Sequence, residues 1–189
     1  MNNFLIKENR EKLQIMSNLV RYNNTTHIHD EDVAEHSFYV AFYTMQLCDC
    51  IGIKGKYKEL AICYALIHDV HEIILSDIPH NTKEMIPELG RICSDYEKTF
   101  NKSYFPEIVN ELDQISEEDS ELIKFVVVLA DTLSVKQYAI QECKYGNVEH
   151  YEEIENNANS RVRKIISAIE KIRGEAVGMI LSDMFREEL

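Results

Sequence analysis

The feature that most constrains the fold is the near absence of strand and turn signals along the chain. The 189 residues include only three prolines and six glycines, and no Asn-Gly or Asp-Gly pair joins two alternating apolar runs. Strands and hairpins usually carry such signals, whereas apolar residues three and four positions apart indicate helices. The sequence therefore predicts an all-α protein.

Capping residues and apolar periodicity divide the chain into helices. The clearest is a long helix with an N-cap at Ser116 and an end at Gly146. A second helix begins near Asp32, where Asp30 or Asp32 caps it and Glu35 completes a capping-box-like start. The other expected helical segments are 4–20, 57–70, a short turn before 76, a stretch from 81, 91–101, 105–112, and the C-terminal runs VRKIISAIEKI and AVGMILSDMF.

Length and composition point to one domain with an ordinary hydrophobic core. With 45% hydrophobic residues, the chain can bury a core without disulfide bonds. The five cysteines are an odd number and form no CxxC pair, so we expect reduced thiols that are mostly buried. Because we see no signal peptide and no run of about 20 apolar residues, we expect a soluble, cytoplasmic protein with no membrane contact.

The net charge of −13 argues against a nucleic-acid polymer as partner. Proteins gain affinity for DNA and RNA mainly by neutralising backbone phosphates, which an acidic chain does poorly. A small phosphorylated ligand is still compatible, because a metal ion and one or two basic side chains supply local positive charge.

Polar residues interrupt several apolar helices and form a candidate metal site. His68 and Asp69 are adjacent at the end of an apolar stretch, where burying both groups is costly without a compensating charge. Asp131 interrupts the aliphatic run VVVLADTLSV, and His36 lies inside the expected second helix. A lone helical histidine is usually structural, so the combination carries the prediction. Two imidazoles and two carboxylates suit one divalent transition-metal ion such as cobalt or manganese.

The same residues carry a resemblance to a known family. The matching segments are Arg21-Tyr22, VAEHS, HDVHEIILSDIPHNTK and ADTLSVKQYAIQE, in that order over roughly the first three-quarters of the chain. Their H…HD…D pattern resembles the HD-domain metal phosphohydrolases, and more closely the bacterial YfbR-like 5′-deoxynucleotidases. The resemblance implies an HD-domain helical bundle over residues 1–189, with the metal-site core at about 20–145 and C-terminal helices at about 148–189. It also implies a homodimer.

Carried over residue by residue, the resemblance implies a role for each site residue. Glu72 and Arg21 are the expected catalytic residues, since Glu72 would manage the proton of the attacking water and Arg21 would clamp the phosphate. Glu72 follows His68 by four residues and so shares its face if the helix continues. Lys83 is left outside the site as a surface lysine. The expected metal ligands are His36, His68, Asp69 and Asp131, and the expected substrate-binding residues are Arg21, Tyr22, His36, Asp69, Asp77, Ile78, Pro79, His80 and Asp131.

One position departs from the family pattern. The tryptophan that usually follows the arginine is Tyr22 here, and the chain contains no tryptophan. The family tryptophan is thought to help exclude a ribose hydroxyl, whereas a tyrosine gives an aromatic wall of different shape and polarity. The choice between deoxyribose and ribose is therefore open at this point.

The sequence predicts an enzyme that removes the 5′-phosphate from (deoxy)nucleoside monophosphates by metal-activated water. The same four ligands also suit a nucleoside triphosphate phosphohydrolase. A di-iron oxygenase needs two further histidines after the HD pair, and only His71 and His80 follow before His150. A non-catalytic nucleotide-binding module is the remaining alternative, although such proteins are expected to lose ligands that this chain keeps.

Overall fold

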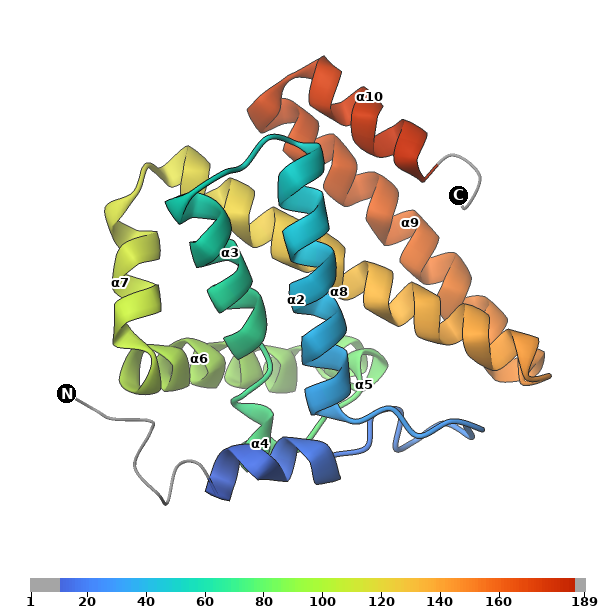
Figure 1. The fold of residues 1–189 in the computed structure, drawn as a ribbon. Coiled ribbons are helices and arrows are strands. Elements are labelled where there is room, and N and C mark those ends of the chain that lie inside the picture. Colours follow the sequence, from blue (N-terminus) through green and yellow to red (C-terminus); the bar gives the residue numbers. More distant parts are fainter. Residues whose placement is uncertain (1–10, 186–189) are drawn as a thin grey trace.

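The computed structural model describes residues 11–185, and these residues confirm the all-α prediction (Figure 1). Apart from one isolated antiparallel bridge between Val20 and Asp32, the regular structure described over this range is helical. Much of the expected helix 4–20 lies outside the described residues, and its described part ends at Asn18 rather than at residue 20. The elements are η1 (Gln14–Asn18), α2 (Val33–Cys50), α3 (Lys56–Ile67), α4 (Glu72–Leu75), α5 (His80–Met85), α6 (Pro87–Tyr104), α7 (Pro106–Gln114), α8 (Glu117–Lys144), α9 (Val148–Arg173) and α10 (Glu175–Met184).

The main hydrophobic core lies between the long helices. Its fully buried members include Val40 of α2, Ala61 of α3, Leu129 of α8 and Val162 of α9. Figure 1 shows α2 crossing in front of α8, with α9 running beside α8 and α3 on the other side of α2. α2 therefore packs against both α3 and α8. α2 carries His36, α8 carries Asp131, and His68 and Asp69 directly follow the end of α3.

Two of the expected helix starts are confirmed at atomic detail. The Asp32 carboxylate, rather than Asp30, caps α2 by accepting a hydrogen bond from the Glu35 backbone N–H at 2.8 Å. The Ser116 hydroxyl caps α8 by accepting from the Asp119 backbone N–H at 3.1 Å. Both caps satisfy N–H groups that a helix start leaves without an intrahelical acceptor.

The expected helix 57–70 ends three residues early, at Ile67. The next backbone bonds span three residues instead of four, from Val70 N–H to Ile67 O at 3.2 Å and from Glu72 N–H to Asp69 O at 3.0 Å. Such bonds wind the chain more tightly than an α-helix. His68 and Asp69 therefore lie in a turn between α3 and α4. The continuous helix that would place Glu72 on the face of His68 is absent here.

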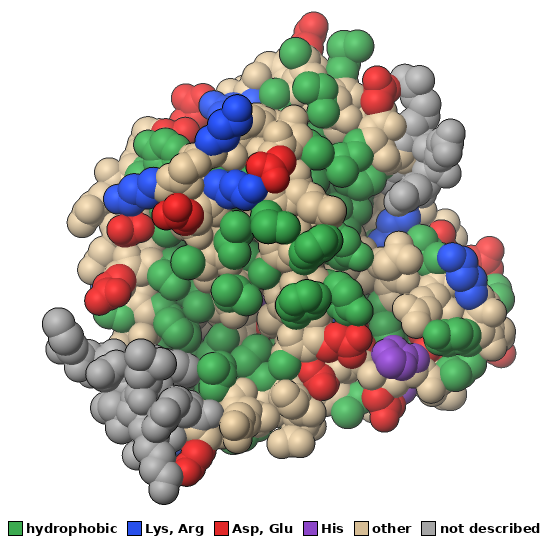
Figure 2. All heavy atoms as spheres, in the orientation of Figure 1, with side chains coloured by type: hydrophobic (Ala, Val, Ile, Leu, Met, Phe, Trp, Pro, Cys, Tyr) green, Lys and Arg blue, Asp and Glu red, His purple; other side chains and the backbone are tan. Residues whose placement is uncertain are grey.

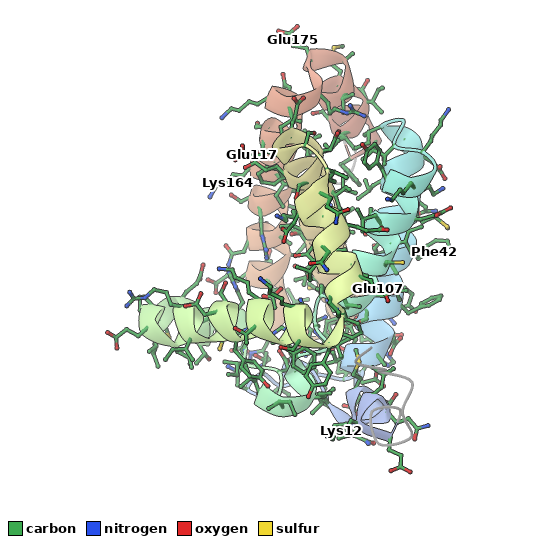
Figure 3. The ribbon with its side chains drawn as sticks, turned by 90° about the vertical axis from the view of Figure 1, so that its left-hand side faces the viewer. Lys12, Phe42, Glu107, Glu117, Lys164 and Glu175 are labelled. Atoms are coloured by element: carbon green, nitrogen blue, oxygen red, sulfur yellow. The ribbon has the colours of Figure 1, made fainter. Side chains whose placement is uncertain are left out.

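Several apolar side chains lie on the surface of α2. Phe38 is 62% exposed and Phe42 is 43% exposed. Figure 2 shows hydrophobic side chains gathered at the centre of the face that α2 crosses, and Figure 3 shows Phe42 directed away from the body of the protein.

No helix within residues 11–185 is both long enough and apolar enough to span a bilayer.

The cysteines are only partly as expected. All five are free, and Cys48 and Cys93 are buried. Cys50 and Cys63 are exposed, however, and Cys143 is half-buried, so the expectation that most thiols are buried is wrong. Apolar residues surround these cysteines in the sequence, but the sequence positions alone do not show which of them meets solvent.

Candidate metal centre and active site

The structure brings His36, His68 and Asp69 into one group that can hold a metal ion. One ligand atom from each residue lies within 4.8 Å of the other two. Asp69 Oδ2 is 3.0 Å from His68 Nε2 and 3.6 Å from His36 Nε2. Both Nε2 atoms are buried, and neither has a hydrogen-bond partner among the residues that the structure describes. Buried polar atoms are nearly always satisfied, so these two nitrogens fit a site built for a cation.

The other ring nitrogen of each histidine is held by a hydrogen bond. His68 Nδ1 lies 2.7 Å from the Ala65 carbonyl oxygen, which only accepts, so Nδ1 carries the proton. His36 Nδ1 lies 3.0 Å from the Ser134 hydroxyl. Contacts of this kind fix the orientation of a metal-binding imidazole and leave its Nε2 lone pair free for the ion.

We expect Ser134→Ala to weaken divalent-metal affinity by roughly 10- to 100-fold, because His36 loses the contact that orients its ring. Calorimetric titration of the metal-free protein with Mn²⁺ or Co²⁺ measures this change. Ser120→Ala is a matched control, since Ser120 is another buried serine of α8. Equal metal affinity in the wild type and the Ser134 variant would contradict the assignment.

Asp131 lies at the edge of this group rather than inside it. Its Oδ1 is 3.3 Å from His36 Nε2, while its Oδ2 faces the Arg161 guanidinium of α9 at 3.7 Å. Arg161 was not among the residues predicted from the sequence. As one of several basic residues on an amphipathic helix, it carries no local signal that separates it from a surface arginine.

Electrostatics show that the site favours positive charge. Burial alone would lower the pKa of His68, but the Asp69 and Asp131 carboxylates raise it to about 9. Burial alone would raise the pKa of Asp131, but the His36 and His68 imidazoles lower it to about 2. Burial, together with the Arg21 guanidinium, lowers the pKa of His36 to about 4. Without a metal ion, the carboxylates are thus ionised at neutral pH and His68 is cationic, with a second proton on Nε2 that a bound metal ion would replace.

Arg21 lies beside the metal group and is itself held by a carboxylate. Its Nη1 is 2.5 Å from Glu31 Oε2, and both side chains are largely buried. The Arg21 charge helps to lower the pKa of Asp69, and it partly opposes the rise in pKa that burial causes at Glu72 and Asp77. Arg21 therefore pairs with Glu31 and also lies at the candidate metal site.

Tyr22 stacks against α8 instead of facing solvent. Its ring lies parallel to that of Tyr138, with 4.6 Å between the ring centroids, and makes an edge contact with Tyr151 of α9 at 5.7 Å. Its backbone φ is +56°, in the left-handed region that residues with a Cβ rarely adopt. The aromatic stack holds Tyr22 in this conformation next to Arg21.

Glu72 is buried at the start of α4, close to the metal group despite the early end of α3. Burial and the neighbouring Asp69 and Asp77 raise its pKa to about 10. Its Oε2 has no hydrogen-bond partner within the described part of the chain. The carboxyl group is thus placed to hold or pass a proton.

The expected sugar-side segment follows α4. Burial raises the pKa of Asp77, while Arg21 and the Tyr22 backbone N–H lower it, so Asp77 lies next to that pair. Asn23 donates to the Asp77 carbonyl oxygen at 2.9 Å. Ile78 and Pro79 are half-buried, whereas His80 is exposed and pairs with Glu84 at 3.2 Å. The structure therefore leaves His80 outside the group of contacts that links Asp77 to Arg21.

The histidines that a second metal would need are engaged elsewhere. His71 Nδ1 lies 3.1 Å from the His68 carbonyl oxygen, and His80 faces Glu84. Over residues 11–185, the group of possible metal ligands contains only His36, His68 and Asp69. This arrangement gives no support to the dinuclear alternative.

Three residues near the site were absent from the sequence prediction or were placed outside it. Lys83 was assigned to the surface, but its charge partly opposes the rise in pKa that burial causes at Glu72 and Asp77. Ser134 follows Asp131 by three residues on the same helix, so this spacing was a usable signal. Arg161 had no such signal, because α9 meets α8 only in the folded protein.

Comparisons with known proteins agree with this geometry. Residues 10–177 match the family described as 5′-deoxynucleotidase YfbR-like. A relative from Photorhabdus temperata, 5′-deoxynucleotidase yfbR, is 27% identical over 154 residues, which cover 75% of this chain and 74% of the relative.

Solved structures share the fold. The HD phosphohydrolase DatZ of cyanophage S-2L, bound to dA and one catalytic Zn²⁺ ion, has a TM-score of 0.72 at 18% identity, covering 96% of each chain. An HD-domain phosphohydrolase from Listeria innocua has a TM-score of 0.64 at 18% identity, covering 96% of this chain and 86% of its own. The protein PH0347 from Pyrococcus horikoshii OT3 has a TM-score of 0.61 at 26% identity, covering 96% of this chain and 97% of its own. By its match over residues 10–177, the chain belongs to the YfbR-like 5′-deoxynucleotidase family, and the prediction of an HD-fold nucleotide-hydrolysing enzyme is confirmed.

Proposed function

We propose that this protein hydrolyses the 5′-phosphate of (deoxy)nucleoside monophosphates. The observation that carries the proposal is the convergence of two buried, unpartnered imidazole nitrogens with Asp69, beside the buried guanidinium of Arg21. A phosphate monoester carries two negative charges near neutral pH. A metal ion held by the imidazoles and Asp69 would face it from one side, and the Arg21 guanidinium would face it from another.

One divalent metal ion fits the donor set. His36, His68 and Asp69 would hold it, with Asp131 as the fourth ligand. Bound there, such an ion would supply the positive charge that polarises a phosphoryl oxygen and makes water more acidic. The mixed nitrogen and oxygen ligands favour a transition metal over magnesium or calcium.

The protein's own side chains divide the remaining work. Arg21 orients the phosphate and stabilises the charge that develops on it as the bond to the 5′ oxygen breaks. Glu31 keeps the Arg21 guanidinium in place through its ion pair. Glu72 holds or passes the proton that moves between the attacking water and the leaving 5′ oxygen. Water contributes hydroxyl to the phosphate, and the products are a nucleoside and inorganic phosphate.

The nucleoside part of the substrate is supported by the relatives. The Photorhabdus protein is named a 5′-deoxynucleotidase, and the cyanophage enzyme was solved with dA. In this chain, Tyr22 and Asp77 lie next to Arg21 and form the expected sugar side of the site. The Tyr22 ring stacks on Tyr138, and this contact restricts where the ring can meet a sugar.

A substrate screen tests the proposal. Purified protein is incubated with ribo- and deoxynucleoside mono- and triphosphates, each with Mn²⁺, Co²⁺, Mg²⁺ or no metal, and the phosphate products are separated by chromatography. We expect release of inorganic phosphate from monophosphates, with transition metals giving the highest rates. Rates equal to the metal-free control for every nucleotide would contradict the proposal.

The same screen separates the alternatives. Release of triphosphate, or of successive phosphates from triphosphates alone, would favour the triphosphate phosphohydrolase that uses the same residues. Tight nucleotide binding without hydrolysis would favour the non-catalytic module. The homodimer is part of the proposal, and sedimentation of the purified protein tests it.

A further inference from the structure

Glu142 of α8 is a buried carboxylate with no part in the site described above. Its side chain is fully buried, and it accepts three hydrogen bonds. The backbone N–H groups of Ile28 and His29 donate to its two oxygens at 2.8 Å each, and the Asn147 amide donates at 2.9 Å. Burial of a carboxylate is costly unless hydrogen bonds compensate it. These three hydrogen bonds supply that compensation.

The contact anchors one loop, residues 22–30, to the end of α8. Asn147 also donates to the Thr26 carbonyl oxygen at 2.8 Å, and the Tyr138 hydroxyl donates to the His29 carbonyl oxygen. Figure 1 shows this loop at the lower right, near the end where α8 and α9 meet. The loop is thus fastened by contacts that span more than 100 residues of sequence.

The two ends of the 22–30 loop lead into the site. The Arg21 N–H donates to the Glu31 carbonyl oxygen at 2.9 Å, and the Val33 N–H donates to the Leu19 carbonyl oxygen at 3.0 Å. This short ladder closes the loop at Arg21 and Glu31, whose side chains form the buried ion pair. The conformation of the loop therefore bears directly on where the Arg21 guanidinium lies.

One face of α8 connects the loop to the metal group. Asp131, Ser134, Tyr138 and Glu142 follow one another at spacings of three, four and four residues, which places them in one row on a helix. Asp131 and Ser134 contact His36, Tyr138 stacks on Tyr22, and Glu142 binds the loop backbone. The 22–30 loop and the metal group are therefore both held by the same face of α8.

We infer that Glu142 is a positioning residue: by holding the backbone of the 22–30 loop, it places Arg21 against the substrate phosphate. The expected change in KM rests on the proposed function, whereas the expected change in the loop conformation does not. The Glu142 side chain is hydrogen-bonded to Ile28, His29 and Asn147 rather than to Arg21 or the metal group, so its effect passes through the loop.

The test compares Glu142→Gln with the wild type. A glutamine has the same size but only one acceptor oxygen, so at least one loop N–H meets an NH₂ group and loses its partner. If the loop then holds its binding conformation about one tenth of the time, substrate binding weakens about tenfold. We expect KM for the nucleoside monophosphate to rise about tenfold, with kcat within about threefold and metal affinity unchanged. Glu121→Gln, an exposed position on the same helix, is the matched control.

A double-mutant cycle separates positioning from general destabilisation. In an Arg21→Ala background, the guanidinium that the loop places is gone, so we expect Glu142→Gln to change kcat/KM by less than about threefold. An undiminished tenfold effect in that background would overturn the inference, as would unchanged kinetics in the single variant. Thermal unfolding of each variant, followed by circular dichroism, confirms that the proteins compared are folded.

NMR of the 22.0 kDa protein gives a readout that does not need activity. We expect Glu142→Gln to remove the exchange protection of the Ile28 and His29 amides and to shift the Arg21 side-chain signal. Unchanged protection or an unchanged Arg21 signal would overturn the inference even if the enzyme is active. If the wild type hydrolyses no nucleotide, the proposed function fails, and these two signals still decide the inference.

Discussion

Asp69→Asn is expected to lower both divalent-metal affinity and kcat/KM by about a thousandfold or more. Asp69 Oδ2 is the atom that approaches both imidazole nitrogens, at 3.0 and 3.6 Å. The amide keeps the size of the side chain but removes its negative charge. At about 4 Å and an effective dielectric constant near 20, one pair of unit charges contributes about 4 kcal/mol, which corresponds to about three orders of magnitude.

Two measurements check this expectation. Metal content after dialysis against Mn²⁺ or Co²⁺ reports binding, and phosphate release from a nucleoside monophosphate reports activity. Asp113→Asn, at an exposed position of α7, is the matched control. Full metal content with full activity in the Asp69 variant would show that the ion, if any, is bound elsewhere. Asp131→Asn tests the fourth ligand in the same way.

Glu72→Gln and Glu72→Ala are expected to lower kcat by roughly 10²- to 10⁴-fold while leaving metal content unchanged. The carboxyl group is buried beside Asp69, and its Oε2 is without a hydrogen-bond partner among residues 11–185. General acid–base groups contribute about this much to a reaction, and neither replacement side chain can pass a proton in the same way.

Single-turnover kinetics and metal analysis of the same samples distinguish this role from metal binding. Glu88→Gln, at a highly exposed glutamate of α6, serves as control. Loss of the metal together with activity would move Glu72 into the metal-binding set. Retention of full activity in either Glu72 variant would remove it from the mechanism.

The sequence predicted the helical architecture because its signals are local. The N-caps at Ser116 and at Asp30 or Asp32 were predicted from residues close together in the sequence, and the structure shows the hydrogen bonds of Ser116 and Asp32. His68-Asp69 and Asp131 stood out because polar groups in apolar helices need a compensating partner. The structure brings His36 and Asp69 within ion-pair distance of each other, and Asp131 within ion-pair distance of His36.

The boundary errors also have a local cause. The turn that follows Ile67 is wound by three-residue hydrogen bonds, and the apolar pattern of that segment fits an α-helix equally well. The alignment of Glu72 with His68 required a continuous helix and does not apply for this reason, although Glu72 still lies beside Asp69.

By itself the sequence determined the helices, their caps and the polar residues that a metal site requires, since those features depend on neighbours a few positions apart. Only the tertiary structure decided which residues surround that site. Arg161 reaches Asp131 from α9, and Glu142 holds the 22–30 loop that carries Tyr22. These contacts join residues 30 to 114 positions apart, and such pairings depend on how the helices pack in three dimensions, which no local pattern encodes.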